Sequence, residues 1–383
     1  MQETGRRSAR ARWRNVHLGL GLLAGLWFAF LGLTGSLLVF HKEIDALLNP
    51  DLLTRQSSAG DVMAISALVA VVAEGVGPVL RVDMPADSGG VVRIQAQNGS
   101  APRDPVEVFI DPGDGRILGT RAWRGNFVAV VYDLHYTLLA GRRGRNIVGF
   151  VGLALLASIG SGLYLWWPRG HGFRRALHVK RRPPFSRRVY DIHKSVGLPA
   201  VMLLGVSAIS GVAMEFPDQT RAIVHAVLPA ASSEMSIGLA LEFPRRDPGL
   251  ADAVARARAI IPDGHIRRIL MPDSDAGTYR IYLRRPAETL KSGGLNTVTV
   301  DALTGKLMQV RTTGDYRAAD WFLAWQFPLH NGEAFGIAGR MVVFILGFVP
   351  LTLYLTGLLI WWNKRRARRR SARNGRAAEP GLS

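Results

Sequence analysis

The chain has 383 residues, 48% of them apolar, and a positive mean hydropathy, so a purely soluble protein is not expected. Cysteine is absent, which excludes disulfides, thiolate-held iron–sulfur clusters, covalent c-type haem attachment and a cysteine nucleophile. The net charge of +19 comes entirely from residues 1–16, 168–194 and 363–383, which hold 22 Lys or Arg against three acidic residues, and this partition argues against a nucleic-acid-binding surface.

Four apolar runs of 21 to 23 residues follow one another along the chain, at about 18–40, 147–167, 196–216 and 341–362. Each is long enough for a helix to cross a ~30 Å hydrocarbon core. Basic residues beside spans mark the cytoplasmic side, so both chain ends and the 168–194 loop are expected inside. The first run is longer than the apolar region of a signal peptide, and no small-residue cleavage site follows it, which favours an anchor.

The expected fold is an integral membrane four-helix bundle with two α+β domains on the outer side, in the periplasm of a Gram-negative bacterium. The expected segments are a basic cytoplasmic N-terminus 1–16, a first span 17–41, a first outer domain 42–130, a second span with an outer extension 131–167, a basic cytoplasmic loop 168–192, a third span 193–216, a second outer domain 217–325, a fourth span with an outer extension 326–362 and a basic cytoplasmic tail 363–383.

The second half of the chain repeats the first with very few gaps, which predicts a tandem duplication of helix, outer domain and helix. The first helix of each half shares a spacing of 18 residues from His to Gly and of 23 from His to Phe, in His17, Gly35, Phe40 and in His193, Gly211, Phe216. The second helix of each half shares a longer pattern, in His135, Gly141, Arg145, Gly162, Trp166, Trp167 and in His330, Gly336, Arg340, Gly357, Trp361, Trp362.

The outer segments repeat as well, because residues 77–94 align with 264–281. Apolar spacing predicts helices over 61–76 and 248–261, and alternation or β-branching predicts strands over 79–84, 91–95 and 106–110. Each outer domain is therefore expected to be one helix on a small antiparallel sheet. Residues 111–115 and 301–305 share an Asp-x-x-x-Gly pattern, which predicts a hairpin turn with Gly at positive φ in each half.

Four of the nine histidines occupy equivalent positions of the repeat, and a near-twofold arrangement would bring them together in two pairs. His17 and His193 stand at the cytoplasmic ends of their helices, and His135 and His330 precede their helices on the outer side. Two neutral imidazoles on facing helices are the ligands of a six-coordinate haem iron. We therefore expect two non-covalent haems, one near each membrane surface. The alternatives are interfacial histidines that are hydrogen-bonded to loops, and histidines that bind a proton or another metal.

Every span also carries a Ser-Gly or Thr-Gly dipeptide, ending in Gly35, Gly162, Gly211 and Gly357. The helical rise places Gly35 and Gly211 near the outer histidines and Gly162 and Gly357 near the inner ones, so each glycine is expected to open space for a haem. Close helix packing is the alternative for these glycines. Arg145 and Arg340 are expected to hold haem propionates, with snorkelling at a helix end as the alternative.

These motifs resemble the PepSY-associated transmembrane helix family of iron-regulated inner-membrane proteins, over about residues 11–365. The resemblance rests on the His-to-Gly spacings and on two Tyr-Asp-x-His motifs ending in His135 and His193. It implies PepSY-like outer domains, and the chain length is similar to the ferric-siderophore reductases of the family, in particular the ferrioxamine reductase type.

The resemblance implies an oxidoreductase with two haem b groups. His17 and His193 would bind the entry haem, and His135 and His330 the exit haem. Electrons would pass from a cytoplasmic or quinol donor, across the bilayer, to a ferric siderophore in the periplasm, releasing Fe²⁺. Met214 or Tyr136 could substitute as a haem ligand.

Two other functions are alternatives to a haem-containing reductase. The outer domains could bind a peptide or a partner protein while the helices only anchor them, in which case no haem is expected. The chain could instead transport haem or iron, although the two halves are parallel repeats rather than the inverted repeats common in transporters.

Overall fold

The computed structural model describes residues 2–57, 62–87, 89–98, 101–168, 183–231, 249–273, 277–288, 290 and 294–377. The chain forms two compact units. The first combines Met1–Val39, Tyr132–Pro217 and Leu329–Ser383, and the second combines Phe40–Val131 and Asp218–Pro328. Each unit therefore draws on both halves of the repeat.

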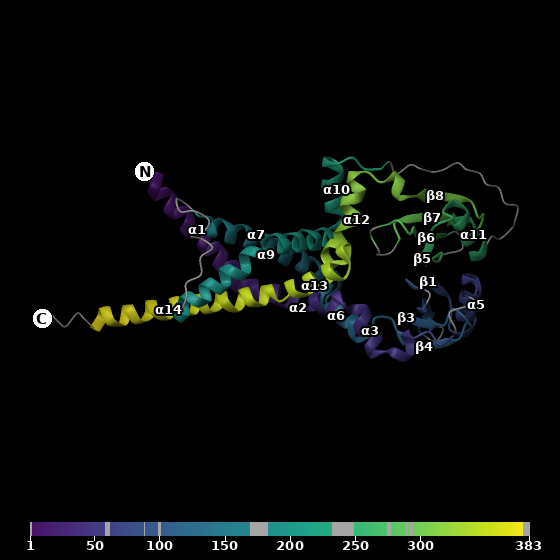
Figure 1. The fold of residues 1–383 in the computed structure, drawn as a ribbon, viewed down its shortest axis with the longest axis horizontal. Coiled ribbons are helices and arrows are strands. Elements are labelled where there is room, and N and C mark those ends of the chain that lie inside the picture. The colour runs from purple at the N-terminus through teal and green to yellow at the C-terminus, as the bar shows by residue number, and fades with distance from the viewer. Residues whose placement is uncertain are drawn as a thin grey trace. The chain divides into compact units, whose positions relative to one another are not determined.

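The first unit is helical, and its main elements are α1 (Gln2–Leu23), α2 (Gly25–Val39), α7 (Gly141–Trp166), α9 (Phe185–Glu215), α13 (Gly336–Leu346) and α14 (Val349–Ala377) (Figure 1). Within the described residues, three helices are apolar and long enough to cross a membrane, namely Gly141–Trp166, Phe185–Glu215 and Glu333–Ser371. The pair Ala9–Leu23 and Gly25–Val39 is a fourth span if the two helices are counted together. The chain is thus a multi-pass membrane protein.

The first span differs from the straight helix expected over 17–41. It is bent by 53° where α1 passes into α2 at Ala24. Glycine weakens a helix, and Gly21 and Gly25 flank the break. A methyl group on Gly25 would lie 2.6 Å from the Tyr354 ring, so the absence of a side chain at Gly25 lets α14 pack closely against this point. The other three apolar runs coincide with α7, α9 and the α13–α14 segment, except that the runs ending at 167 and 216 pass the helix ends by one residue.

Two shorter helices precede the second span of each half. They are α6 (Phe127–Thr137), which carries His135, and α12 (Ala318–Asn331), which carries His330. Residues with positive φ follow both helices: Leu138, Leu139 and Gly141 after α6, and Gly332 and Gly336 after α12. This left-handed backbone makes the sharp turn by which each short helix leads into a span. The "outer extensions" of the sequence are therefore separate helices rather than continuations of the spans.

The second unit is built on one eight-stranded antiparallel sheet in the order β4-β3-β2-β1-β5-β6-β7-β8. Its strands are β1 (Val79–Asp83), β2 (Val92–Asn98), β3 (Ala101–Ile110), β4 (Ile117–Ala122), β5 (His265–Leu270), β6 (Thr278–Arg284), β7 (Asn296–Asp301) and β8 (Leu307–Arg311). Each half contributes four strands, and the antiparallel pair β1–β5 joins them, with Val82 opposite Ile269. We call this pair the seam.

The expectation of two separate small sheets was wrong, because the seam joins the strands of both halves into one sheet. An isolated four-stranded sheet would leave β1 and β5 as exposed edges, and pairing them satisfies both rows of backbone groups. The expected strands over 79–84, 91–95 and 106–110 correspond to β1, β2 and β3. The sequence patterns did not predict β4 and β8. These are the two outermost strands of the sheet, and they have more exposed side chains than the central strands.

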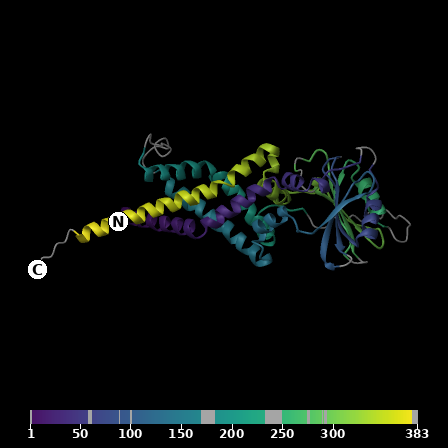
Figure 2. The ribbon, with the colours of Figure 1, turned by 90° about the horizontal axis from the view of Figure 1, so that it is seen from below.

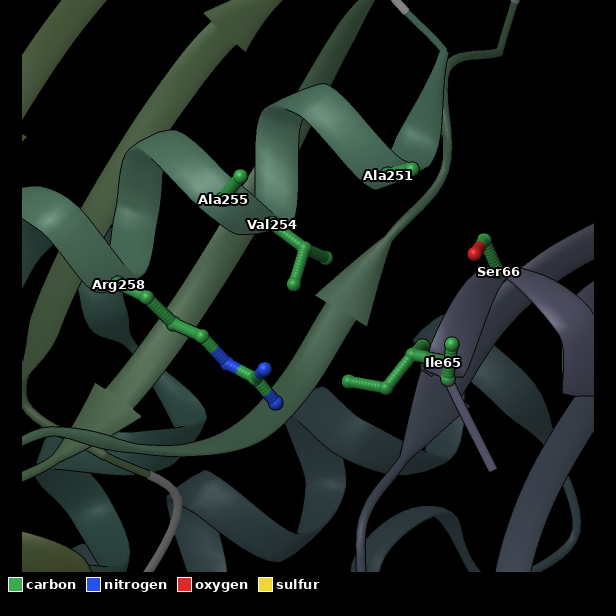
Figure 3. Close-up of a pocket in the computed structure, with 7 residues that line it drawn as sticks. Ile65, Ser66, Ala251, Val254, Ala255 and Arg258 are labelled. Atoms are coloured by element: carbon green, nitrogen blue, oxygen red, sulfur yellow. The ribbon is translucent and has the colours of Figure 1, made fainter. Parts of the chain in front are cut away.

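The helices predicted over 61–76 and 248–261 are present as α5 (Ile65–Gly75) and α11 (Leu250–Ile260), and both cover the same face of the shared sheet (Figure 2). Leu68 of α5 and Ala257 of α11 are fully buried, together with Val82 and Ile269 at the seam. A single core therefore spans both halves of the repeat. A small pocket opens between the two helices, lined by Ile65 and Ser66 on one side and by Val254 and Arg258 on the other (Figure 3).

The two expected hairpin turns are present. Gly115 and Gly305 have φ of 73° and 65°, each after an Asp that begins the turn between the last two strands of its half. Shorter helices complete this unit: α3 (His41–Leu48), α4 (Pro50–Leu53) and α10 (Pro217–Val227).

Candidate functional site

The structure brings the four repeated histidines together in two pairs, in the combination expected from the repeat. The ring centroids of His17 and His193 are 6.4 Å apart, with an angle of 89° between the rings. Those of His135 and His330 are 6.1 Å apart, at 58°. All four side chains belong to the helical unit and are half-buried. We call these the inner pair and the outer pair.

The spacing within each pair suits one metal ion between two imidazoles. Bonds of about 2 Å from a metal to the facing nitrogens place the two ring centroids about 6 Å apart. Among the described residues, no group of three or more His, Cys, Asp or Glu could hold a metal ion. Each pair therefore offers two imidazole nitrogens without a third His, Cys, Asp or Glu from the described part of the chain, and two imidazoles are the protein donors that a six-coordinate haem needs.

A hydroxyl group contacts the Nδ1 atom of every one of these histidines. The four contacts join His17 to Ser161 at 3.0 Å, His135 to Thr34 at 3.0 Å, His193 to Thr356 at 2.8 Å and His330 to Ser210 at 3.0 Å. Each hydroxyl donates its own proton to a backbone carbonyl one turn earlier in its helix. The hydroxyl oxygen is therefore the acceptor, and Nδ1–H is the donor.

Backbone carbonyls reinforce this assignment. His17 Nδ1 lies 3.1 Å from the carbonyl oxygen of Ser158, and His330 Nδ1 lies 3.0 Å from that of Ser207. A carbonyl can only accept, so the proton must reside on Nδ1. The ring is then the neutral tautomer whose Nε2 keeps a lone pair for a metal. Hydrogen bonding of the other ring nitrogen is the usual way in which a protein fixes the orientation of a ligating histidine.

The glycine of each dipeptide packs directly against the same histidine ring. A methyl group on Gly35 or Gly162 would lie 3.0 Å from the Cε1 atom of His135 or His17. The corresponding distances are 3.2 Å for Gly211 against His330 and 3.7 Å for Gly357 against His193. The glycines thus make room for the imidazole itself. This contact was not foreseen, because the sequence analysis assigned their space to the haem.

Each half of the repeat holds its own two histidines. In the first half, α7 supports His17 and α2 supports His135. In the second half, α14 supports His193 and α9 supports His330. Each pair then consists of one histidine from each half. The sequence analysis missed the role of Thr34, Ser161, Ser210 and Thr356, although their recurrence before the four glycines was the signal.

The two predicted propionate arginines contact helix ends. Arg145 donates to the carbonyl oxygen of Met214 at 3.0 Å and to the Glu215 carboxylate at 3.2 Å. Arg340 donates twice to the carbonyl oxygen of Val39, at 2.8 and 3.1 Å. Both therefore stabilise the carbonyl end of a neighbouring helix, where cations are favoured. Their role in holding propionates stays a prediction.

The histidines without a repeat partner are not part of either pair among the described residues. His41, His225 and His265 belong to the sheet-containing unit. His171 and His178 lie outside the described residues. Tyr136, a predicted substitute ligand, lies beneath the Arg145 guanidinium, whose carbon is 5.3 Å from the ring centroid.

The residues of this site lie within a segment of the chain that matches a known family. A family model described as the PepSY-associated TM region matches residues 14–364, a range that includes both histidine pairs and the whole sheet. The chain belongs to this family. Comparison with curated proteins gives no match. Membership of the PepSY-associated family confirms the family resemblance drawn from the sequence, whereas the likeness to its ferric-siderophore reductases, the cofactor and the reaction stay predictions.

Proposed function

We propose that the protein is a membrane oxidoreductase in which the inner and outer pairs each bind one haem b, and that it reduces a ferric siderophore and releases Fe²⁺. The observation that carries this proposal is the pair geometry: two imidazoles face each other twice, each with its Nδ1 proton bound to a hydroxyl and its Nε2 available. Interfacial histidines that were hydrogen-bonded only to loops would have no reason to share this arrangement. Here all four have a Ser or Thr hydroxyl as the partner of Nδ1.

The two pairs lie at different depths along the helices. Helix α9 carries His193 of the inner pair and, 18 residues later, Gly211, which contacts His330 of the outer pair. At 1.5 Å per residue, the two sites are roughly 27 Å apart along the helix, which approaches the ~30 Å thickness of the hydrocarbon core. One site near each surface is the arrangement that a transmembrane electron path requires.

The proposed membrane topology counts α1 and α2 as one bent span, which gives four spans. Lys and Arg concentrate in residues 1–16, 168–194 and 363–383, so the positive-inside rule places both termini and the 168–192 loop in the cytoplasm. The membrane is then the bacterial inner membrane, and the segments that form the sheet lie on its periplasmic side.

Haem iron held by two imidazoles supplies reversible one-electron transfer. The four histidines would provide its axial ligands, and their hydroxyl partners would hold the rings in the ligating tautomer. Hard oxygen chelators bind Fe³⁺ more strongly than the softer Fe²⁺. One electron delivered to each ferric chelate therefore weakens the complex and frees the metal. A cytoplasmic or quinol donor would supply that electron.

The proposal is tested in proteoliposomes that enclose a reductant and face a ferric siderophore and an Fe²⁺-binding dye outside. Wild-type protein should produce Fe²⁺ outside, whereas His330→Ala should reduce the rate to that of protein-free vesicles. His225→Ala is the matched control, because His225 is exposed and belongs to no pair, and it should retain the wild-type rate. Equal rates for wild type and His330→Ala would contradict the proposal and favour a non-redox binding module.

A further inference from the structure

One face of the sheet carries a concentration of arginines that the proposed haem sites do not use. Val82, Ile94, Ile269 and Ile281 are fully buried on the face covered by α5 and α11. Side chains alternate along a strand, so their neighbours point to the opposite face. On the four central strands these neighbours include six arginines, Arg81, Arg93, Arg267, Arg268, Arg280 and Arg284, which we call the arginine face.

The strand register places these arginines close to one another. Asp83 lies opposite Arg93 on one side and opposite Arg268 on the other. Arg267 occupies the extra position of a bulge in β5, between Ile266 and Arg268, so two consecutive arginines turn toward the same face. The repeat relates Arg81 to Arg268 and Arg93 to Arg280, which distributes the charges about the seam.

The charge of this face is not balanced within the described residues. Asp83 accepts from both Arg81 Nε at 2.5 Å and Arg268 Nε at 2.7 Å, so one carboxylate serves two guanidinium groups. No ion pair within the described residues involves Arg93, Arg280 or Arg284. Burial, followed by the nearby charge of Arg284, lowers the pKa of Arg267, although the carboxylates of Asp83 and Asp87 act to raise it. The protein thus holds cations together against their mutual repulsion.

Two of these guanidinium groups also have an unused donor. The Nε atoms of Arg267 and Arg284 are buried and have no hydrogen-bond partner in the described structure. Buried donors in native proteins are nearly always satisfied by protein, water or ligand. Other parts of the same face are neutralised locally, since Arg121 is bound by Asp45 and Glu107, and Arg311 by Asp320. The unbalanced charge is therefore confined to the central strands.

Guanidinium groups bind planar, oxygen-rich anions through two parallel hydrogen bonds. Several guanidinium groups on both sides of the seam suit a small ligand that presents anionic oxygens in several directions. A cationic ligand would be repelled by the same face. Tyr282, opposite Arg268 across the β5–β6 pair, adds an aromatic surface within the cluster.

We propose that the arginine face is a binding site for a small, multiply charged anionic ligand, and that this ligand is an anionic ferric chelate with carboxylate or catecholate oxygens. The anion site stands on the sheet geometry alone, whereas naming the ligand a ferric chelate rests on the proposed function. The resemblance to the ferrioxamine reductase type is then one of architecture, since a cationic ferric hydroxamate does not match this face.

The test uses full-length protein in nanodiscs of zwitterionic lipid, with calorimetric titration of ferric citrate, a ferric tris-catecholate and a cationic ferric trihydroxamate. The two anionic chelates should bind at least about tenfold more tightly than the cationic one and should weaken as salt is added. Arg280→Gln is the main variant, because Arg280 is exposed and its replacement leaves the core intact. It should weaken anionic binding by about tenfold, and Arg284→Gln by more, because Arg284 is more buried.

Arg258→Gln is the matched control, because Arg258 is exposed on α11 on the opposite face of the sheet, and it should bind as wild type does. Equal affinity for cationic and anionic chelates, or unchanged affinity in both variants, would overturn the proposal. Binding of a polyglutamate peptide without binding of any chelate would also overturn it, in favour of an acidic protein partner.

The two proposals fail separately. Tight anion binding that the variants abolish, in a protein that contains no haem and reduces nothing, would sustain the anion site and refute the reductase. Haem-dependent reduction that proceeds equally fast with anionic and cationic chelates would sustain the reductase and refute the anion site.

Discussion

At the scale of single residues, the glycines behind the histidines differ in how much space they leave. Gly162 and Gly357 both face the inner pair, yet a methyl group would lie 3.0 Å from the His17 ring at Gly162 and 3.7 Å from the His193 ring at Gly357. The first distance is shorter than ordinary van der Waals contact and the second is within it. The same substitution should therefore have different effects at two positions that the repeat makes equivalent.

We predict that Gly162→Ala displaces His17 and lowers haem retention at the inner site, whereas Gly357→Ala retains haem as the wild type does. The measurement is the haem-to-protein ratio and the reduced-minus-oxidised spectrum of each purified variant. Equal loss in both variants, or loss in Gly357→Ala alone, would show that the contact with the imidazole does not limit binding.

A second residue with a clear role is Asp111, which is fully buried at the turn after β3. Burial of its carboxyl acts to raise the pKa, but hydrogen bonds from Ser57, Gly113 and Gln56 outweigh burial and hold the pKa well below its ordinary value. The carboxylate therefore stabilises the folded sheet fully above the ordinary Asp pKa of about 4, and this contribution is lost as the pH falls below that value.

We predict that the denaturation midpoint of the sheet-containing unit falls steadily below about pH 4, and that Asp111→Asn lowers the midpoint at neutral pH and flattens this acid dependence. Hydrogen exchange of the β3–β4 backbone amides, measured in the full-length protein, reports the stability of the sheet-containing unit. Asp114→Asn in the same turn is the control, because the Asp114 side chain is 49% exposed. Identical pH profiles for Asp114→Asn and Asp111→Asn would contradict this prediction.

At the scale of elements, the seam makes one cooperative sheet from two repeated halves. Val82 and Ile269 face each other across the seam, and both are fully buried beneath α5 and α11. Burial of these side chains couples the two halves through one core, whereas separate sheets would unfold independently.

We predict that Ile269→Ala destabilises the unit by about 2–5 kcal/mol and accelerates hydrogen exchange in both halves of the sheet, including β2 and β3 of the first half. Leu303→Ala is the control, because Leu303 is 56% exposed and its loss leaves the core unchanged. Faster exchange confined to β5–β8 would mean that the halves unfold separately.

The elements also show where sequence patterns were informative. Long apolar runs predicted α7, α9 and α14, because the length required by the bilayer is a strong constraint. The break at Ala24 was missed, because the apolar run continues through it and hydropathy alone does not distinguish a bent span from a straight one. The seam was missed for a related reason: the pairing of β1 with β5 is a contact between residues almost 190 positions apart, and no local pattern records it.

At the scale of the whole molecule, the duplication explains why the histidine pairing could be predicted. Equal spacings in two halves imply equivalent positions, and a twofold relation brings equivalent histidines together. The hydroxyl partners Thr34, Ser161, Ser210 and Thr356 escaped the sequence analysis, because helix periodicity gives the height of a residue more reliably than the side chain that faces it. The arginine face escaped it too, since it appears only when two halves share one sheet.

Each pair combines one histidine from each half of the chain. We therefore expect two haems, each held by its own two histidines. The most direct test is the haem content and spectrum of the detergent-purified protein, made with ample haem supply, for wild type, His17→Ala, His330→Ala and the control His225→Ala. We predict about two haems per chain in wild type and control, and loss or alteration of one haem in each of the other variants. A wild-type protein without haem would contradict the account.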